Sequence, residues 1–313
     1  MIQVKLYQAS DQITWNRFVA EAKNGHFLFH RDYMEYHADR FQDSSLMFYR
    51  EADLVALMPA NREGDTLVSH GGLTYGGIIS DARMRTPLMI EVFEAIKRDL
   101  PGWGIKRIIY KAIPHIYHSV PAEEDLYALF YHHAQLVRRD VSSTIDKRAR
   151  VAFSKGRRWG VKQAQKNGLV AQESQDFATF LQIEEHTLVT RHGVKPVHTA
   201  TELQKLAQRF PAHIKLFAAY RDKTMLGGVV MYVSENVAHA QYVSANDEGK
   251  KSGALDLILA WLINERYADK RYFDFGISTE AQGRYLNVGL INNKEGFGSR
   301  ATVYDFYELN LSV

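Results

Sequence analysis

DEGKKSGALDLILAWLI, residues 247–263, links a strand-like run to the most regular helical pattern of the chain. A polar loop with two glycines and two lysines comes first, and apolar residues then recur at helical spacing. The pattern predicts a helix over Ser252–Ala268 that begins directly after the loop. Unpaired backbone N–H groups at a helix start bind phosphate, and glycine lets a diphosphate approach the backbone. The alternative is a solvated loop in which Ser252 caps the helix.

The segments around this stretch predict a sheet flanked by helices. Three strand-like runs precede it and are joined by short polar turns, which is typical of an antiparallel meander; they cover His213–Arg221, Met225–Ser234 and Asn236–Ala245. Before them we predict helices at Ala149–Asn167, Asp176–Thr190 and Thr201–Arg209 and a short strand at Leu169–Gln172. After them we predict a strand at Arg271–Phe275, a helix at Ala281–Asn292 and a last strand at Thr302–Leu311.

The first half of the chain repeats this order of elements. Helices at 11–23 and 32–39 precede strands at Leu46–Arg50, Leu54–Ala60 and Thr66–His70; a helix at Pro87–Asp99, a strand at Lys106–Lys111, a helix at Glu123–Ala134 and a strand at Gln135–Ser142 follow. A repeat of this size indicates two domains of one topology, and 313 residues suit two domains of about 150. We therefore predict a mixed α/β fold with domains 1–145 and 146–313 packed together.

Composition excludes several kinds of site. The chain has no cysteine, which excludes disulfides, cysteine-ligated metals and a cysteine nucleophile. Its 13 histidines show no metal-ligand spacing, so we expect no metal. The formal charge of +3 argues against a protein that coats nucleic acid. The N-terminus lacks a signal-peptide pattern and the densest apolar run, Leu257–Ile263, is too short to span a bilayer, so we expect a cytoplasmic protein without membrane insertion.

Three motifs in the second half carry a resemblance to a known superfamily. They are KKSGAL at 250–255, YFDFG at 272–276 followed by Gly289, and KEGFG at 294–298. With the order of elements, they resemble the GNAT acyltransferase superfamily and its two-domain, FemAB-like branch. The first motif departs from the Q/R-x-x-G-x-G/A pattern of that family, because Lys250 replaces the usual Gln or Arg and the final small residue is absent.

The resemblance implies an acyl-CoA site in the second domain and a first domain that has lost its cofactor loop. Bacterial relatives of similar sequence include N-acyltransferases that modify nucleotide-linked amino sugars for surface polysaccharides such as the O-antigen of lipopolysaccharide. The candidates for binding acyl-CoA are Gly249, Lys250, Lys251, Ser252, Gly253, Ala254 and Asn287.

Acyl transfer from a thioester to an amine requires a general base within hydrogen-bond reach of the amine. The candidates are Glu280, Asp274 and His239. Each has a structural alternative, since Glu280 could begin a helix, Asp274 could hold backbone donors and His239 could be a core residue. By the resemblance, Lys294 faces the acyl carbonyl or a substrate phosphate. Backbone N–H groups of diverging strands would contact the thioester oxygen.

A basic stretch opens the second domain. Residues 147–166 contain eight basic and no acidic side chains. Because arginine suits phosphate oxygens, Arg157 and Arg158 are candidates for binding a nucleotide diphosphate or the CoA 3′-phosphate; the alternative is a solvated helix. The other substrate-binding candidates are His192, Lys195 and His198 in a polar loop and Tyr75 in the Gly-rich stretch 71–77, each of which could instead belong to an ordinary turn.

The predicted function is N-acyl transfer from acyl-CoA to the amine of a nucleotide-linked amino sugar, with thymidine diphosphate (dTDP) as the carrier, by direct attack in a ternary complex. Two alternatives stay open: a FemAB-type aminoacyl-tRNA-dependent transferase that builds a peptidoglycan bridge, and a degenerate GNAT pair that only binds. We expect small-molecule partners and no nucleic acid, and the oligomeric state is left open.

Overall fold

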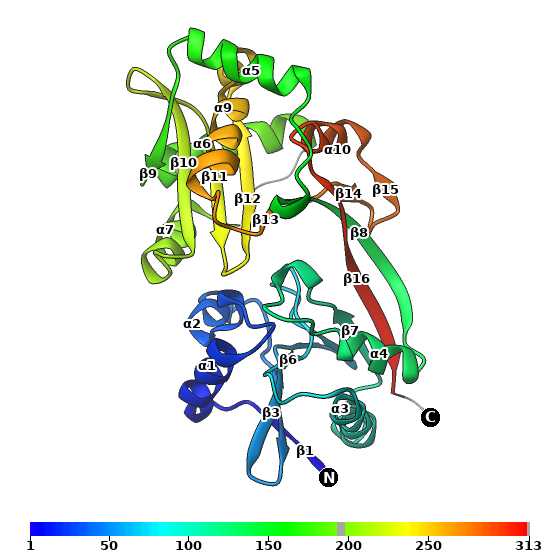
Figure 1. The fold of residues 1–313 in the computed structure, drawn as a ribbon. Coiled ribbons are helices and arrows are strands. Elements are labelled where there is room, and N and C mark those ends of the chain that lie inside the picture. The colour runs from blue at the N-terminus through cyan, green and yellow to red at the C-terminus, as the bar shows by residue number, and fades with distance from the viewer. Residues whose placement is uncertain (193–197, 312–313) are drawn as a thin grey trace. The chain divides into compact units, whose positions relative to one another are not determined.

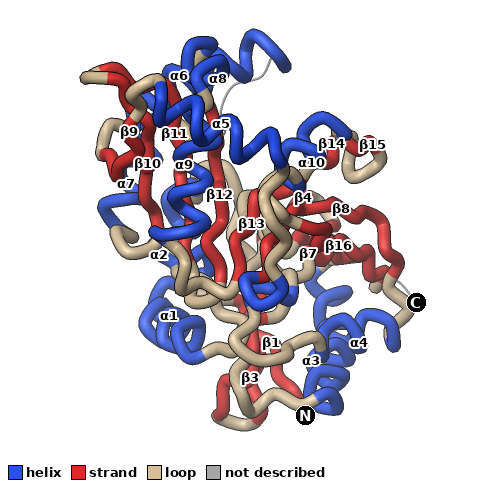
Figure 2. Tube along the Cα trace, turned by 45° about the horizontal axis from the view of Figure 1, so that its top comes forward, coloured by secondary structure: helices blue, strands red, loops and turns tan. Residues whose placement is uncertain are grey.

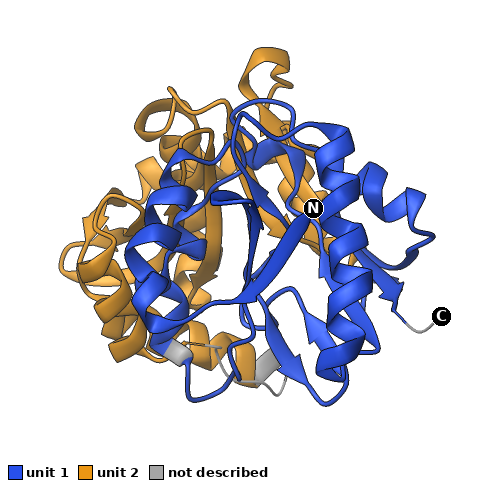
Figure 3. Cartoon of the chain, turned by 90° about the horizontal axis from the view of Figure 1, so that it is seen from below, with its two compact units in different colours: residues 1–140, 280–285, 303–313 blue, residues 141–279, 286–302 orange. Residues whose placement is uncertain are grey.

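The computed structural model describes residues 1–192 and 198–311, without the side chains of His37 and of residues 190–192. The chain divides into two compact units (Figure 3). Unit 1 comprises residues 1–140, 280–285 and the end of the chain from Val303, and unit 2 comprises residues 141–279 and 286–302. This differs from the predicted boundary at 145/146 because β8 (Gln135–Asp146) and β16 (Arg300–Asn310) each run from one unit into the other.

Unit 1 contains two small sheets and the helices of the first half of the chain (Figure 1). One sheet has the order β1-β2-β3-β6 and is antiparallel throughout. In the other, β4 pairs with β5, β5 runs parallel to β7, and β7 pairs with β16. The elements are β1 (Ile2–Leu6), α1 (Gln12–Glu21), α2 (Arg31–Met34), β2 (Leu46–Arg50), β3 (Asp53–Met58), β4 (Asn61–Glu63), β5 (Thr66–Val68), β6 (Ile79–Ser80), α3 (Thr86–Asp99), β7 (Arg107–Lys111) and α4 (Glu124–Tyr131).

Unit 2 is built on one sheet with the order β8-β13-β12-β11-β10-β9 (Figure 2). All its strand pairs are antiparallel except β12 and β13, which run parallel. The elements are α5 (Lys155–Lys166), β9 (Val170–Ser174), α6 (Phe177–His192), α7 (Ala200–Arg209), β10 (Ile214–Arg221), β11 (Thr224–Val233), β12 (Val237–Ala245), α8 (Asp247–Ser252), α9 (Ala254–Trp261), β13 (Tyr272–Ile277) and α10 (Val288–Glu295). The short strands β14 (Thr279–Glu280) and β15 (Tyr285–Leu286) pair with each other.

The predicted strands and most predicted helices occur in the predicted order in both units, and the structure adds the unpredicted strands β1, β4, β6, β14 and β15. Three predicted helices differ. The helix predicted from Ala149 begins at Lys155, because the Ser154 hydroxyl accepts the Arg157 N–H and caps it there. The helix predicted over Ser252–Ala268 is divided into α8, α9 and one π-helical turn over Leu262–Arg266. The helix predicted over Ala281–Asn292 is wrong: residues 281–283 form the turn between β14 and β15, and α10 follows.

Side-chain alternation along β12 separates an apolar face from a polar face. Ala238 and Ala240 belong to the apolar core that also contains Ile258 and Leu259 of α9. His239 therefore points to the opposite face. Ser244 lies on that same opposite face, since its β11 partner Gly228 would place a Cβ against the Phe180 ring of α6. The sheet of unit 2 thus has α9 on one face and α6 on the other.

Candidate active site

The two parallel strands of unit 2 separate part-way along their length. β12 and β13 pair from Val237↔Tyr272 to His239↔Asp274. Beyond that point no pairing joins them in the described part of the chain, although β12 continues to Ala245 and β13 to Ile277. Gly276 takes a left-handed φ of 73° on β13. The divergence opens the sheet at the carboxyl ends of two parallel strands.

A cavity of about 520 Å³ lies at this divergence, and all its walls come from unit 2. Its apolar wall is formed by Val243, Leu255, Leu259, Phe275, Leu290 and Phe297. Its charged side chains are Arg157, Lys250, Asp256 and Lys294. Thr187 of α6 and Ser244 of β12 supply hydroxyls. Because α6 and α9 lie on opposite faces of the sheet, the cavity reaches both faces where the strands part.

His239 and Asp274 form a buried pair where the parallel pairing of β12 and β13 ends. His239 Nδ1 donates to Asp274 Oδ2 at 2.7 Å, and the hydroxyls of Ser142 and Thr144 on β8 donate to Asp274 Oδ1 at 2.6 and 2.7 Å. Burial acts to raise the pKa of Asp274, but these donors outweigh burial and hold the pKa below its usual range. Two of the predicted catalytic residues are therefore adjacent, with Asp274 fixing the orientation of His239.

Lys294 of α10 lies on the cavity wall and reaches the diverging strand. Its ammonium donates to the carbonyl oxygens of Gly276 at 2.8 Å and Ile277 at 2.7 Å. Burial lowers the pKa of Lys294 to about 8, and the Asp274 carboxylate acts against this shift. Lys294, Asp274 and His239 are thus brought together at the divergence.

The predicted phosphate loop is largely helical. Asn246 caps α8 by accepting the Gly249 N–H at 2.8 Å, and Gly253 joins α8 to α9 with a left-handed φ of 81°. A Cβ on Gly253 would lie 2.5 Å from the carbonyl oxygen of Gly160 on α5. The glycine at this position is therefore required by helix–helix packing.

Three of the predicted acyl-CoA-binding residues line the cavity, and four do not. Gly249, Lys250 and Gly253 are on the wall. Ser252 and Ala254 are buried, and the Ser252 hydroxyl donates to the Gly249 carbonyl. Lys251 is exposed, and Asn287 caps α10 by accepting the Leu290 N–H. The assignment of these residues to acyl-CoA stays a prediction.

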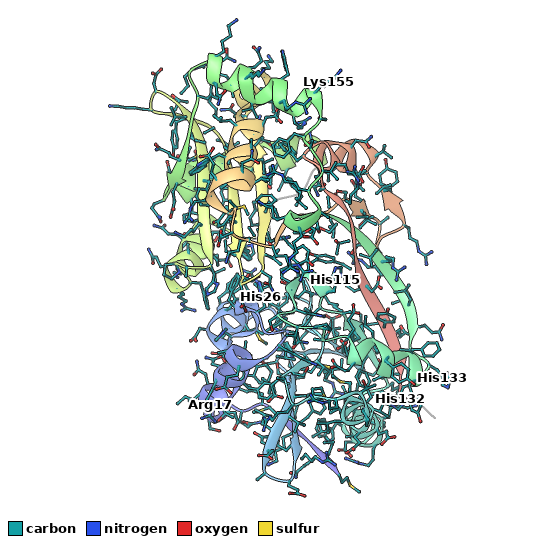
Figure 4. The ribbon with its side chains drawn as sticks, in the orientation of Figure 1. Arg17, His26, His115, His132, His133 and Lys155 are labelled. Carbon is teal, nitrogen blue, oxygen red and sulfur yellow. The ribbon has the colours of Figure 1, made fainter. Side chains whose placement is uncertain are left out.

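The two predicted arginines of α5 point to different places. Arg157 is on the cavity wall, where its Nη1 donates to Asp256 Oδ1 at 2.6 Å and its guanidinium lies over the Phe297 ring. Arg158 lies in a second, open groove of about 660 Å³ between α5 and α9, together with Arg150 and Lys162. Lys155 marks the start of this basic helix in Figure 4. One ligand in the cavity would contact Arg157 and not Arg158.

Three of the remaining predicted residues have defined places away from the cavity wall, and two cannot be placed. His198 is buried, and its Nδ1 hydrogen-bonds with the Tyr242 hydroxyl of β12. Tyr75 is buried in unit 1, with its ring 4.5 Å from that of Tyr117. Glu280 is exposed on β14 and falls within unit 1. The side chain of His192 and the whole of Lys195 lie outside the described residues.

The Gly-rich stretch around Tyr75 has the geometry of packed turns. A Cβ on Gly77, which has a φ of 85°, would meet the Tyr110 ring, and Tyr110 accepts the Ile78 N–H at 2.7 Å. Lys111 of β7 is buried and donates to the carbonyls of His70 and Leu73. These contacts account for the glycines without a ligand.

Several polar residues near the cavity were not identified by the sequence analysis, among them Thr187, Ser244 and Glu184. Thr187 and Ser244 line the wall, and Glu184 is buried behind them on α6. The only signal in the sequence is a pair of adjacent glutamates on a helix, of which one is buried and one exposed. The amphipathic pattern of α6 is too weak to tell the two apart.

The part of the chain that forms this site is similar to a known protein family. A family model described as an acetyltransferase (GNAT) domain matches residues 147–285. The matched segment is somewhat less than half of the chain. The match confirms the prediction of a GNAT-type acyltransferase, and the GNAT domain coincides with most of unit 2. No curated protein sequence matches the chain.

Solved structures show the same fold over the whole chain. FemX matches with a TM-score of 0.67 and 10% identity, covering 97% of this chain and 96% of its own. L-PGS from Bacillus licheniformis matches with 0.63 and 13%, covering 99% and 94%. A tandem GNAT protein from the clavulanic acid biosynthesis pathway matches with 0.51 and 9%, covering 100% and 99%. The predicted tandem GNAT-like fold is therefore confirmed, and identities this low carry the fold alone.

Neither a metal-ligand cluster nor a membrane-spanning helix occurs among the described residues. No group of three or more His, Asp or Glu side chains among them is placed to hold a metal ion. His132 and His133, adjacent in sequence, follow α4 in unit 1 (Figure 4), and His132 stacks on Phe93. Within the same residues, every helix is too short or too polar to cross a bilayer.

Proposed function

We propose that the chain transfers an acyl group from acyl-CoA to the amine of a nucleotide-linked amino sugar, with dTDP as the carrier. The observation that carries the acyl-transfer step is the cavity at the divergence of β12 and β13, with Lys294 on its wall. The GNAT domain match supports this chemistry. The nucleotide sugar rests on the sequence resemblance.

The cavity fits the chemistry of acyl-CoA in two respects. Its apolar wall, which includes Val243, Leu259 and Phe275, suits the pantetheine arm and an acyl chain. Arg157 and Lys250 are the cations that would hold phosphate oxygens. Asp256 lies beside Arg157, so the diphosphate must approach nearer to Lys250 than to the start of α9. Acyl-CoA supplies the thioester carbonyl.

The residues of the chain divide the chemistry between donor and acceptor. Backbone N–H groups freed by the strand divergence, with the Lys294 ammonium, would stabilise negative charge that develops on the carbonyl oxygen. His239, oriented by Asp274, is a candidate to bind the acceptor or take its proton. The chain has no cysteine, which excludes an acyl-enzyme formed on a cysteine. The step proposed for this site is therefore direct attack by the amine on the thioester.

An aminoacyl-tRNA-dependent transfer is the second candidate. Two observations favour it: α5 packs against Gly253, where a GNAT phosphate loop was predicted, and the exposed side of α5 carries Arg158, Lys162 and a Trp159 side chain that is 64% exposed. A basic helix with an exposed aromatic ring suits RNA. Binding of this kind falls steeply with salt.

Thermal shift and thiol release together test the two candidates. CoA or acetyl-CoA at a hundred times its dissociation constant should stabilise the chain by about 2.7 kcal/mol. Acetyl-CoA with a set of dTDP-linked amino sugars should then release free thiol and give an N-acetylated product by mass spectrometry. No stabilisation by any CoA, together with salt-sensitive binding of aminoacyl-tRNA, would replace the first candidate by the second.

A further inference from the structure

Glu184, Ser244 and Thr187 form a hydrogen-bonded group behind and on the cavity wall. Ser244 Oγ lies 3.2 Å from Thr187 Oγ1, within hydrogen-bond distance, and the Ser244 hydroxyl is also hydrogen-bonded to the Glu184 carboxyl. Glu184 and Thr187 are three residues apart on α6 and so lie on one helix face. Thr187 and Ser244 line the cavity, whereas Glu184 is 7% exposed. The hydroxyls connect a buried carboxyl to the cavity.

This group lies on the α6 face of the sheet, where His239 also points. The α9 face holds the apolar core, in which Ala240 and Phe275 pack. A donor with a long apolar arm suits the α9 side of the cavity, and a polar acceptor suits the α6 side. Ser244 lies at the end of β12 where the two sides meet.

The surroundings of Glu184 leave its charge without an ionic partner. Burial raises the pKa of Glu184, and the hydrogen bond from Ser244 acts against this shift. The elements that pack mainly against α6 are β11, β12 and α7. No charged side chain of the described residues contributes to the pKa shift of Glu184 beyond burial and the Ser244 hydrogen bond. On α6 itself, Glu185 and His186 are exposed. A carboxyl in such a place takes up a proton more readily than one at the surface.

We propose that these three residues form the acceptor-side subsite, in which Ser244 contacts the attacking amine and passes its proton to Glu184. The proposal rests on the proposed N-acyl transfer and specifies a primary ammonium as the group that this subsite takes. The ammonium gives one proton to Ser244 Oγ as the Ser244 hydroxyl proton moves to the Glu184 carboxylate. The neutral amine then forms the C–N bond and the C–S bond breaks. The second nitrogen proton leaves with the thiolate, and Glu184 returns its proton to solvent.

The experiment compares Glu184→Gln with Glu184→Asp, Ser244→Ala and the adjacent Glu185→Gln as the exposed control. Rates are measured with acetyl-CoA and dTDP-linked amino sugars from pH 6 to pH 10, and acetyl-CoA binding is measured by calorimetry. Glu184→Gln and Ser244→Ala should lower kcat about 10²-fold near pH 7 while acetyl-CoA binding is unchanged. The loss should shrink toward pH 10, where the amine is neutral without help. Glu184→Asp should recover part of the rate, and Glu185→Gln should match the wild type.

Two results overturn the proposal in distinguishable ways. A wild-type chain that turns over amines, with Glu184→Gln and Ser244→Ala following the same pH profile, refutes the subsite alone. A wild-type chain that binds acetyl-CoA and acylates none of the amines refutes the proposed function and the subsite with it. Circular dichroism melts of each variant separate a lost proton path from a lost fold, and Ser244→Ala provides the answer if Glu184→Gln does not fold.

Discussion

Replacing Gly253 by alanine should destabilise the chain through packing and backbone strain. The left-handed φ of 81° costs an alanine about 1–2 kcal/mol. Its Cβ would lie 2.5 Å from the Gly160 carbonyl oxygen, and such overpacking costs about 1–3 kcal/mol. The two causes sum to about 2–5 kcal/mol, which corresponds to a fall in Tm of roughly 6–15 °C for a domain of this size.

Two other glycines near α5 separate these causes. Gly168 has a φ of 72° with no heavy atom within 4 Å of its Cβ position, so Gly168→Ala should show the backbone cost alone, about 1–2 kcal/mol. Gly156 has an ordinary φ and meets only the Ser154 hydroxyl at 3.9 Å, so Gly156→Ala should stay within about 0.5 kcal/mol of the wild type. Melting curves of the three variants should therefore order as Gly253→Ala, Gly168→Ala, then Gly156→Ala.

The same series tests what Gly253 is for. If Gly253→Ala melts together with Gly168→Ala, the close packing of α5 against α9 is refuted. If it melts with the wild type, the backbone reasoning fails as well. A titration with CoA at a temperature where Gly253→Ala is folded should give wild-type affinity, because this glycine serves packing; a selective loss of CoA affinity would restore the phosphate-loop hypothesis.

Three further predictions concern buried ionisable groups. Lys294→Met should lower the rate of acyl transfer about 10²–10³-fold, as loss of an oxyanion donor does, and the wild-type rate should fall as pH rises through about 8. A wild-type rate for Lys294→Met would contradict this. Asp274→Asn should cost about 1–3 kcal/mol in urea unfolding; because the folded pKa of Asp274 is lowered, this stabilisation is present above the unfolded pKa of about 3.9 and is lost below it, so the two proteins should converge in acid. His118 is buried and its pKa is lowered to about 4, so as the pH falls the unfolded chain binds a proton before the folded chain does. The free energy of unfolding should therefore fall by roughly 3 kcal/mol from pH 6.5 to pH 4. His118→Gln should flatten this pH dependence, and an unchanged pH dependence would show that His118 does not cause it.

The order of helices and strands followed from the sequence because each element carries its own periodicity. β10, β11 and β12 are largely apolar runs joined by short polar turns, and all three were predicted to within two residues at each end. The prediction of a helix at residues 281–283, which form a turn, failed for a local reason. Ala281 and Gln282 adopt positive φ values of 48° and 54°, which residues with a Cβ rarely do, so nothing in their identity marked a turn.

Residues of the site could be predicted where the residue type itself indicates the role. They could not be predicted where the role depends on contacts with residues that are far apart in the sequence. His239 and Asp274 were each predicted as candidates, whereas their adjacency is shown by the parallel pairing of β12 and β13 in the structure. The role of Gly253 could not be predicted, because a glycine that lets a diphosphate approach the backbone and a glycine that lets a helix pack closely have the same sequence signature. Arg157 and Arg158 are neighbours in sequence, yet only the packing of α5 on α9 shows that one of them meets Asp256.

The divergence of β12 and β13 explains why a lysine is buried at this place. Separating two paired strands deprives their backbone groups of partners, and buried groups left so are costly. Lys294 supplies two of the missing donors, to the carbonyls of Gly276 and Ile277. The same ammonium is thereby held on the cavity wall with a pKa of about 8. The interaction that stabilises the open sheet therefore also positions a charge for acyl transfer, and the stability and activity of Lys294→Met should fall together, whereas Glu184→Gln should lose activity without a comparable loss of stability.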